Sequence, residues 1–390
     1  MDILYILTFC GLLKPKSGGQ NRFFNLTNQL KKKYNNITIL ESKEFMDLND
    51  EKFGVIHGFS DLKISSNVMP LSRDFNLNFI KKVFKIINNN QIDIILFSHP
   101  SGIFVTKFLM WLMNKKVPII YDAHNVESEF TTEIFFNNNK FSKFKQIIIP
   151  LYVTILEHIS CKYLVDHIIA VSNKDKNTFI KKYKFIDKVS VIPSGCNLMP
   201  LISKNESYKF KMKYGLDPLS KIIIFHGSYS HPPNEEAIKL IKDFIATQFE
   251  ELNENIQFVV GGSDVPVSES SNFKSVGFID NIWEFLSMAD IAIVPILKGG
   301  GTKLKVLDYL SVGLPVVTTK KGIEGIDAKN NEHVIIVDSV DDEFIDKINY
   351  FIENEDEMLR IGKNARKLAE NKYDWNKIGY ELNNLLEEIL

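Results

Sequence analysis

A glycine-rich turn followed by a helix is the part of this 390-residue chain best suited to phosphate chemistry. Residues 295–319, PILKGGGTKLKVLDYLSVGLPVVTT, predict a strand end, a turn, a helix and a further strand. Gly299, Gly300 and Gly301 permit backbone paths that a Cβ would hinder, and Thr302 is the expected N-cap. Free N–H groups and the positive dipole end at such a helix start suit a phosphate. Taken alone, the same pattern also fits an ordinary βαβ crossover with a flexible entry loop.

Charged side chains are expected beside this turn. Lys303 and Lys305 flank Leu304 at the helix start and would add positive charge where a phosphate would bind. Asp308 follows about one turn later and could accept hydrogen bonds from sugar hydroxyls. The segment therefore combines features for binding phosphate and sugar groups.

The composition limits the classes of function. With 47 Lys and Arg against 48 Asp and Glu, the chain has a net charge of −1 and no signature of nucleic-acid binding. The charged residues are unevenly distributed along the chain, because residues 1–195 contain 26 Lys and Arg but only 17 Asp and Glu. This basic half would suit an anionic membrane or a phosphorylated substrate, and incidental surface charge explains it equally well.

Cysteine usage and the N-terminal sequence point to a reducing compartment. Cys10, Cys161 and Cys196 are widely spaced and show neither metal-ligand spacing nor a disulfide framework. Asp2 leads almost directly into the apolar run Ile3–Phe9, without the basic leader of a signal peptide. We therefore expect a cytoplasmic protein.

Strand-like and helix-like patterns alternate along the whole chain, which predicts the α/β class with parallel sheets. The alternation occurs twice and is broken at residues 193–197, PSGCN, so we expect two doubly wound, Rossmann-like domains. The predicted domains span residues 1–195 and 196–375, and the last helix, 376–390, is expected to return to the first domain. Ligands of such sheets bind beyond the carboxyl ends of the strands, so a cleft between the domains is expected.

Two motifs of the first half follow predicted strands. In the segment SGGQNR, Gly18 and Gly19 would let the backbone approach a phosphate or a sugar, or form a tight turn only. In YDAHNVE, His124 could hydrogen-bond a sugar hydroxyl or a developing charge. Asp122 or Glu127 would then orient His124, although a structural histidine is the alternative.

Two motifs of the second half also follow predicted strands. Gly227 and Ser228 of FHGS can offer backbone and hydroxyl donors to a phosphate, and Asn234 is expected to help start the next helix. In VGFID, the backbone would contact a base edge while Phe278 or Ile279 packs against the ring.

Several motifs are absent from the sequence. No Asp-x-Asp pair is present to hold a divalent metal against a nucleotide diphosphate, and HExxH, Walker and GxSxG motifs are also missing. The dinucleotide fingerprint GxGxxG is missing as well, which argues against a nicotinamide dehydrogenase. We therefore expect no metal and no cofactor, with any diphosphate neutralised by helix N-termini, backbone donors and lysines.

These segments, in their shared order along nearly the whole chain, resemble glycosyltransferase family 4, whose members are retaining enzymes of GT-B fold. The most specific match is GGGTKLKVLDYL with the trailing GLPVVTT, which is similar to a glycine-rich branch of the family. The other matching segments are SGGQNR, YDAHNVE, VIPSG, FHGSYSHPPNEEA, VGFIDNIWEFLSMADIAIVP and the terminal YDW.

The resemblance implies that a nucleotide-diphosphate sugar donor binds mainly to the second domain. The acceptor, a glycan, a lipid-linked glycan or a small molecule, would enter against the first domain. The resemblance assigns catalytic roles to His124, near the transferred sugar, and to Lys303, at the diphosphate. It also implies that Ile279 lies near the base and that Asp308 holds the ribose hydroxyls. The full set expected at the donor is Gly18, Gly19, Gly227, Ser228, Ile279, Gly300, Gly301, Thr302, Lys303, Leu304, Lys305 and Asp308.

Two departures from the family pattern keep other functions open. Gly300 stands where many members carry a glutamate that contacts the donor sugar, and Asp308 replaces a second, longer glutamate. A glycosyltransferase is the expected function. A nucleotide-sugar 2-epimerase of GT-B fold and a non-catalytic sugar-nucleotide binding protein are the alternatives.

Attachment to the cytoplasmic face of a membrane is a further expectation. The apolar region Ile147–Val171 is interrupted by Glu157 and other polar residues, which predicts a buried helix followed by a strand and not a spanning helix. Just before this region, lysines alternate with aromatic residues. They would dock on anionic lipid or form a solvated helix start. These residues are Lys140, Phe141, Lys143, Phe144 and Lys145.

Overall fold

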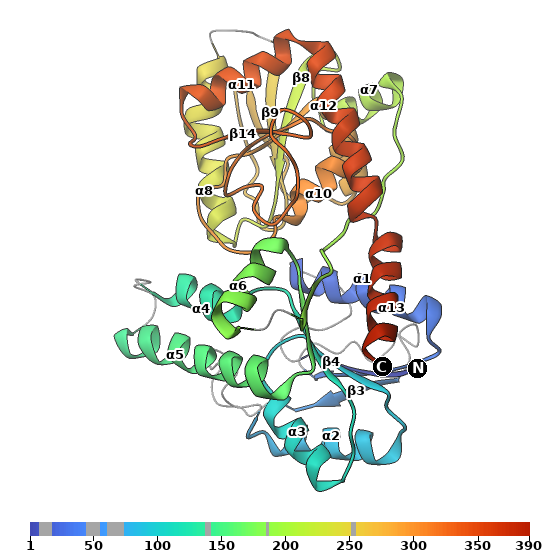
Figure 1. The fold of residues 1–390 in the computed structure, drawn as a ribbon. Helices are drawn as coiled ribbons and strands as arrows, with labels where there is room; N and C mark the ends of the chain where they lie inside the picture. The colour runs from blue at the N-terminus through green and yellow to red at the C-terminus, as the bar shows by residue number, and fades with distance from the viewer. Residues whose placement is uncertain (8–17, 44–54, 61–73, 137–141, 185–186, 251–254) are drawn as a thin grey trace. The chain divides into compact units, whose positions relative to one another are not determined.

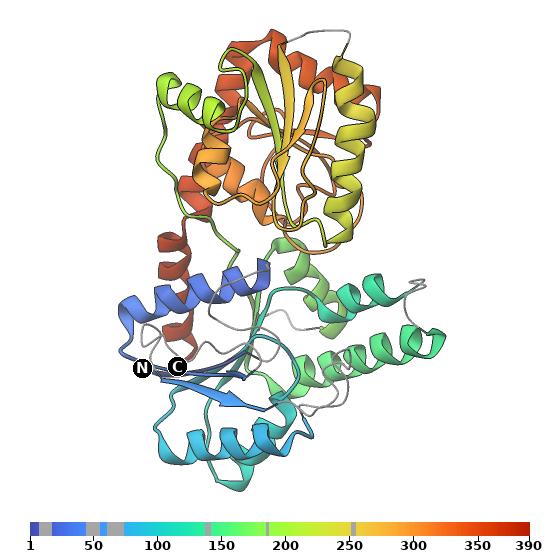
Figure 2. The same cartoon turned by 180° about the vertical axis from the view of Figure 1, so that it is seen from behind.

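The computed structural model of the chain describes residues 1–7, 18–43, 55–60, 74–136, 142–184, 187–250 and 255–390. These residues form two compact units, one of Met1–Ser194 with Trp375–Leu390 and the other of Gly195–Asp374. Each unit is a mainly parallel sheet flanked by helices (Figures 1 and 2), so the predicted α/β class with two doubly wound domains is confirmed. Cys10, Ser17, Lys140 and Phe141, which the sequence singles out, lie outside the described residues.

The described strands of the first unit form a seven-stranded parallel sheet in the order β3-β2-β1-β4-β5-β6-β7. Their central residues are almost all buried apolar side chains, because helices cover the sheet on both faces. The strands are β1 (Asp2–Leu7), β2 (Asn36–Ser42), β3 (Val55–Phe59), β4 (Ile94–Phe97), β5 (Ile119–Ala123), β6 (His167–Ala170) and β7 (Val189–Val191).

The helices of this unit connect successive strands, except for the last, which returns from the end of the chain. That last helix packs against α1, where a Cβ on Gly379 would lie only 2.5 Å from the Cβ of Gln29. The helices are α1 (Gly18–Lys33), α2 (Leu77–Asn89), α3 (Ile103–Leu112), α4 (Glu127–Phe135), α5 (Lys143–Ile159) with a π-helical turn (Ser160–Leu164), α6 (Asn173–Tyr183) and α13 (Trp375–Ile389).

The described strands of the second unit form a sheet in the order β10-β11-β9-β8-β12-β13-β14, in which only β10 runs antiparallel. The strands are β8 (Lys221–His226), β9 (Ile256–Gly261), β10 (Ser268–Ser270), β11 (Phe273–Ser275), β12 (Ile291–Val294), β13 (Val316–Thr319) and β14 (Ile335–Val337).

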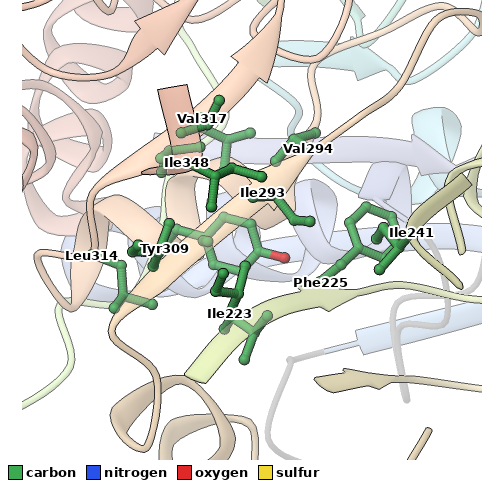
Figure 3. Packing of buried hydrophobic residues seen from close by; sticks show 14 of the residues in the cluster. Ile223, Phe225, Ile241, Ile293, Val294, Tyr309, Leu314, Val317 and Ile348 are labelled. Atoms are coloured by element: carbon green, nitrogen blue, oxygen red, sulfur yellow. The ribbon is translucent and has the colours of Figure 1, made fainter. Parts of the chain in front are cut away.

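Helices of the second unit pack on this sheet around a large apolar core. Figure 3 shows part of that core, in which the ring of Tyr309 lies among side chains such as Ile223 and Ile293. The helices are α7 (Lys204–Lys213), α8 (Pro232–Leu240), α9 (Ile282–Ser287), α10 (Leu304–Ser311), α11 (Asp342–Glu353) and α12 (Glu355–Leu368). Shorter π and 3-10 turns extend α8 (Ile241–Ile245 and Ala246–Phe249) and α12 (Ala369–Tyr373).

Both sheets have a point at which the strand order reverses. In the first unit β2 and β4 lie on opposite sides of β1, and in the second unit β9 and β12 lie on opposite sides of β8. The loops that leave two such neighbouring strands diverge to opposite faces of the sheet and leave room for a ligand. These two points therefore position the candidate site residues.

Helix α4 was not predicted from the sequence. Its N-cap residue, Val126, has no side chain able to cap the helix. Glu157, on α5, supplies the cap instead: its carboxylate accepts hydrogen bonds from the backbone N–H of Glu127 at 2.8 Å and of Ser128 at 3.1 Å. A cap supplied from 30 residues away leaves no local signal. The strands β3 and β10 were missed as well, because each is short and carries polar residues or glycine.

Candidate functional site

Two glycine loops of the second unit leave the neighbouring strands β8 and β12 at their carboxyl ends. The first holds Gly227, directly after β8, and the second runs from β12 through Gly299 to α10. A Cβ on Gly227 would lie 2.8 Å from the Nζ atom of Lys305 and 2.7 Å from the Nδ2 atom of Asn234. The backbone of the first loop therefore lies so close to the start of α10 that a Cβ would displace the side chains of Asn234 and Lys305.

The second loop is shaped by glycines and by one lysine. Gly299 and Gly301 have φ values of +95° and +73°, a region that glycine adopts without strain. Lys303 is 9% exposed, and its ammonium donates hydrogen bonds to the carbonyl oxygens of Gly299 at 2.9 Å, Gly300 at 3.0 Å and Gly301 at 2.7 Å. Lys303 thus holds the loop in shape through the hydrogen bonds of its ammonium, a role that the sequence did not suggest.

The start of α10 differs by one residue from the prediction. The expected N-cap, Thr302, is wrong, because Lys303 occupies the cap position and makes no side-chain cap hydrogen bond. The Oγ1 atom of Thr302 is instead buried without a hydrogen-bond partner among the residues that the structure describes. Lys303 provides no capping side chain for the first turn of α10, and anion binding by the backbone of Leu304 and Lys305 stays a prediction.

Lys305 is the charged side chain nearest to both loops. Its ammonium donates a 2.6 Å hydrogen bond to the Oδ1 atom of Asn234 and lies 3.8 Å from the centre of the Phe225 ring. Burial, and then the charge of Lys303, lower the pKa of Lys305 well below its ordinary value. A ligand with phosphate charge would compensate both effects.

Asn234 holds the two loops together and does not cap a helix as expected. The N-cap of α8 is His231, which makes no side-chain cap hydrogen bond. The Nδ2 atom of Asn234 donates to the carbonyl oxygen of Ser228 at 2.8 Å, while its Oδ1 atom accepts from Lys305. The hydroxyl of Ser228 contacts that of Ser230 at 2.8 Å. This arrangement fixes the Gly227–Ser228 backbone beside α10.

Asp308 faces a histidine that the sequence did not single out as a site residue. The Oδ2 atom of Asp308 lies 3.5 Å from the Nε2 atom of His226, and the Nδ1 atom of His226 lies 3.1 Å from the hydroxyl of Tyr309. The backbone N–H of His226 donates to the same hydroxyl at 3.0 Å, so that hydroxyl can donate to Nδ1. A neutral His226 then carries its proton on Nε2, toward Asp308.

The partly exposed side chain of Asp308 retains capacity for further hydrogen bonds. Burial lowers the pKa of His226, while the neighbouring Asp308 carboxylate opposes this shift. The signal in the sequence for His226 was its position as the last residue of a strand, directly before the glycine turn.

Ile279 lies beside the same loops, against glycine backbone. A Cβ on Gly261 would be 2.8 Å from the Cγ1 atom of Ile279, and a Cβ on Gly262 would be 2.0 Å from the carbonyl oxygen of Gly227. The pair Gly261–Gly262 therefore allows the loops after β8, β9 and β11 to pack closely. Phe278 is 67% exposed next to Ile279. The sequence did not identify Gly261 or Gly262.

In the first unit, His124 lies against the start of α1. A Cβ on Gly19 would be 3.3 Å from the Cδ2 atom of His124, and the imidazole ring of His124 lies edge-on to Phe23, with 5.4 Å between the ring centres. Gly18 and Gly19 form the first residues of α1. The structure therefore brings Gly19 and His124 together within this unit.

Of the two acidic residues expected to orient His124, only Glu127 lies beside it. The Nε2 atom of His124 lies 3.7 Å from the Oε1 atom of Glu127, whose Oε2 atom lies 3.6 Å from the Nε2 atom of His99. Asp122 instead accepts hydrogen bonds from Tyr5 at 2.6 Å and from the buried Arg22 at 2.7 Å.

The buried surroundings of this cluster shift its acid–base equilibria. Burial lowers the pKa of His124 and raises the pKa of Glu127, whereas their mutual attraction opposes both shifts. His124 is therefore neutral near pH 7, and its buried Nδ1 atom has no hydrogen-bond partner among the described residues. His99, after β4, is a member of the cluster that the sequence did not identify.

In the described part of the chain, no group of three or more His, Cys, Asp or Glu side chains is arranged to hold a metal ion. The described cysteines, Cys161 and Cys196, are buried and free.

Comparisons with known proteins identify the family. A model of Glycosyltransferase Family 4 matches residues 16–199, and a model described as Glycosyl transferases group 1 matches residues 220–354. No curated protein sequence matches the chain.

Solved structures with the same fold cover the whole chain at low sequence identity. HepE of Anabaena, in complex with UDP, is 14% identical, with a TM-score of 0.74 and 100% of both chains covered. Sucrose-phosphate synthase of Thermosynechococcus elongatus is 13% identical, with a TM-score of 0.73 and coverage of 100% of this chain and 99% of that one. WaaG, a glycosyltransferase involved in lipopolysaccharide biosynthesis, is 13% identical, with a TM-score of 0.71 and coverage of 98% and 99%. Together with the two family models, which span most of both units, these likenesses confirm that the chain belongs to the family 4 glycosyltransferases of GT-B fold.

Proposed function

We propose that this glycosyltransferase moves a sugar from a nucleotide-diphosphate sugar to an acceptor hydroxyl, with retention of the anomeric configuration. The observation that carries the proposal is the meeting of the Gly227 turn with the start of α10 at the strand-order reversal of the second unit. Backbone donors, a buried lysine and a partly exposed carboxylate converge there. These groups match the diphosphate and the ribose of a nucleotide.

The diphosphate would bind between the two loops. The backbone of Gly227, the hydroxyl of Ser228 and the first amides of α10 would donate hydrogen bonds to it, and Lys305 would supply the positive charge. Lys303 contributes mainly by holding the loop of Gly299–Gly301 in shape, because its ammonium already donates to three carbonyl oxygens. No metal ion is required for this mode of binding.

The nucleoside would extend from the diphosphate along α10 and the loop after β11. Asp308 would accept hydrogen bonds from the ribose hydroxyls, and Ile279 would contact the base. The crystals of HepE contain UDP, UDP with glucose, and UDP-glucose, which supports a nucleotide sugar as donor.

Transfer would break the bond between the anomeric carbon and the diphosphate oxygen and form a bond to the acceptor oxygen on the same face of the sugar. The acceptor proton would pass to an oxygen of the departing diphosphate, so that charge and atoms balance without a covalent enzyme intermediate. The amides of α10 and Lys305 would stabilise the negative charge that grows on the leaving group. His124 would hydrogen-bond the transferred sugar as a neutral imidazole.

The acceptor would be a glycan or a lipid-linked glycan that binds to the first unit. The role of WaaG in lipopolysaccharide biosynthesis supports a glycan acceptor. The widely spaced, unpaired cysteines are consistent with catalysis in the cytoplasm, where we place the enzyme.

A nucleotide-sugar screen tests the proposal. Thermal shift with UDP-, GDP- and ADP-sugars, in the presence of EDTA, should show stabilisation by one nucleotide series. A separate assay for released sugar should detect slow hydrolysis of the same donor. NMR of the product should show the anomeric configuration of the donor. Inversion at the sugar 2-position would identify an epimerase instead, and binding without hydrolysis or transfer to any acceptor would identify a binding protein.

A further inference from the structure

Helix α5 carries an apolar stripe that no described part of the chain covers. Six of its side chains recur every three or four residues and are between 39% and 72% exposed. This spacing places them along one side of the helix and of the π-helical turn that continues it. The stripe consists of Phe144, Ile147, Leu151, Ile155, Ile159 and Tyr163.

The opposite side of α5 is fixed within the first unit. Ile149, Val153 and Leu156 are buried there. Glu157 is completely buried, and its carboxylate binds the first amides of α4 and accepts a 2.7 Å hydrogen bond from the hydroxyl of Tyr183. Figures 1 and 2 show α4 beside α5 from both sides. The helix is therefore an integral part of the unit and presents one face outward.

By length and composition alone, residues 143–164 could cross a membrane. The predicted helix followed by a strand is nevertheless confirmed, because α5 and its π-helical turn end at Leu164 and β6 begins at His167. The packing of the buried face of α5 prevents this helix from crossing a membrane. Insertion would separate Glu157 from its hydrogen-bond partners and expose its carboxylate to hydrocarbon. A helix anchored on one face and apolar on the other suits the interface of a bilayer, parallel to its plane.

The exposed charges on α5 and its π-helical turn are all positive. Lys143 and Lys145 are exposed at the start of α5, and Lys162 is exposed at its end. Throughout residues 143–163, all of which the structure describes, Glu157 is the single carboxylate, and it is buried. Lysines on such an edge bind anionic lipid headgroups, whereas a protein partner would meet no acceptor or donor pattern along the stripe itself.

The surface beyond the end of α5 has the same character. Leu164 lines a cavity of about 1080 Å³ together with the aromatic side chains of Phe104, Phe108 and Trp111 on α3. These three aromatic residues are between 47% and 73% exposed. Three lysines and two aspartates, Asp93 and Asp166, share the lining of this cavity, and Lys107 pairs with Asp166 at 3.3 Å. Aromatic and cationic groups lie together there, as they do at membrane interfaces, with a small excess of positive charge. The lysines are Lys107, Lys115 and Lys116.

We propose that the α5 stripe docks the protein on an anionic lipid bilayer, with the helix lying in the headgroup region and its lysines on lipid phosphates. The 17 residues of α5 would lie flat over about 25 Å of the surface. The cavity beside α3 would face the same headgroups. This inference stands independently of the sugar-transfer reaction, since none of the residues of the stripe belongs to the donor site.

Flotation of the full chain with vesicles tests the docking. The wild type should float with vesicles of equal parts phosphatidylglycerol and phosphatidylcholine and bind pure phosphatidylcholine much less. Leu151→Ser with Ile155→Ser should weaken partitioning by about tenfold or more, because two central apolar contacts are lost. The matched control is Leu219→Ser with Val267→Ser, which changes side chains of the second unit that are 77% and 79% exposed. It should bind like the wild type.

The lysines are tested separately. Lys143→Gln with Lys145→Gln should lose most of the salt-dependent part of binding, and Lys204→Gln with Lys320→Gln, whose side chains are 86% and 74% exposed on the second unit, should not. Circular dichroism and thermal unfolding verify that each variant is folded.

Two results would overturn the proposal. One is a wild type that stays with the unbound fraction at low salt. The other is a dimer, seen by light scattering, that the stripe variant alone converts to monomer, since a second copy would then be the occupant. Nucleotide binding measured without vesicles should be equal in all these variants, so failure of docking and failure of the proposed donor site remain distinguishable.

Discussion

The ammonium of Lys305 lies 2.6 Å from the amide oxygen of Asn234, and this hydrogen bond joins the first turn of α10 to the first turn of α8. The same Asn234 side chain donates to the carbonyl oxygen of Ser228. One buried lysine and one amide thus fix the distance between the two loops that would enclose a diphosphate. Burial disfavours the charged form of a lysine in this position until an anion binds.

Donor binding should therefore take up a proton. The pKa of free Lys305 is lowered by burial, and a bound diphosphate favours the ammonium and raises it. At pH values between the pKa of Lys305 in the free protein and its pKa in the complex, a proton binds together with the nucleotide. Calorimetry of nucleotide-diphosphate binding in buffers of different ionisation enthalpy, at pH 7 to 9, measures this uptake. Lys305→Met should abolish the uptake and weaken binding by about tenfold or more, while Lys204→Met, at an exposed lysine of α7, should change neither.

Asp308→Asn should weaken nucleotide binding by about 10- to 100-fold, because hydrogen bonds from ribose hydroxyls to a carboxylate would be replaced by bonds to a neutral amide. The 2′-deoxy analogue of the same nucleotide should show the loss with wild-type protein and little further loss with the variant. Asp346→Asn, at an exposed position of α11, is the control. Equal affinities of wild type and Asp308→Asn would reject the ribose contact.

The three glycines of the second loop should differ in their tolerance of a side chain. Gly299→Ala and Gly301→Ala each force an alanine into positive φ, which costs about 1–2 kcal/mol. Gly300 is not among the residues with positive φ, so Gly300→Ala should leave the free energy of unfolding nearly unchanged. Chemical denaturation of the three variants measures the difference. A destabilised Gly300→Ala with stable neighbours would contradict this account of the loop.

Glu127 should tune the protonation of His124. Attraction to the Glu127 carboxylate raises the pKa of His124, while burial lowers it further than this attraction restores. Glu127→Gln removes the attraction, so the pKa of His124 should fall, and the acid limb of the kcat profile should move to lower pH. Glu129→Gln, at an exposed residue of the same helix that pairs with Lys182, should leave the profile in place. An acid limb that moves to higher pH would exclude Glu127 as the partner of His124.

The stability of the first unit should depend on the protonation of Asp74. Burial raises the pKa of Asp74 from 3.8 to about 6, although the backbone N–H of Gly102 donates to its carboxylate at 2.8 Å. Because this pKa is raised in the folded protein, the contribution of protonated Asp74 to the free energy of unfolding is present below about pH 4 and is lost as the pH rises through 6. Asp74→Asn keeps an acceptor for Gly102 without this dependence.

Denaturation of both proteins at pH 4 and pH 7 measures the effect. The stability of Asp74→Asn relative to wild type should increase by about 2 kcal/mol between these pH values. A relative stability independent of pH would show that Asp74 is not held at a raised pKa.

The sequence predicted the strands and the order of the motifs, because buried parallel strands are continuous apolar runs and glycine turns follow them directly. It did not predict contacts that join distant residues. Glu157 caps α4 from 30 positions away, and Asn234 meets Lys305 across 71 positions, so neither interaction leaves a local pattern. The direction of a long side chain was equally hidden. Lysine is a typical phosphate ligand, yet the ammonium of Lys303 donates its hydrogen bonds to the carbonyl oxygens of its own loop.

The return of α13 to α1 has a consequence for the order of folding. Ile378, Leu382 and Leu386 are buried in the same apolar cluster as Phe23 and Leu26, so the first unit includes a helix that is synthesised after the whole second unit. The second unit is continuous in sequence and can fold as soon as it has emerged. During synthesis, the apolar face of α1 therefore stays without its partner helix while about 340 further residues are made, and the first unit is completed only after the second.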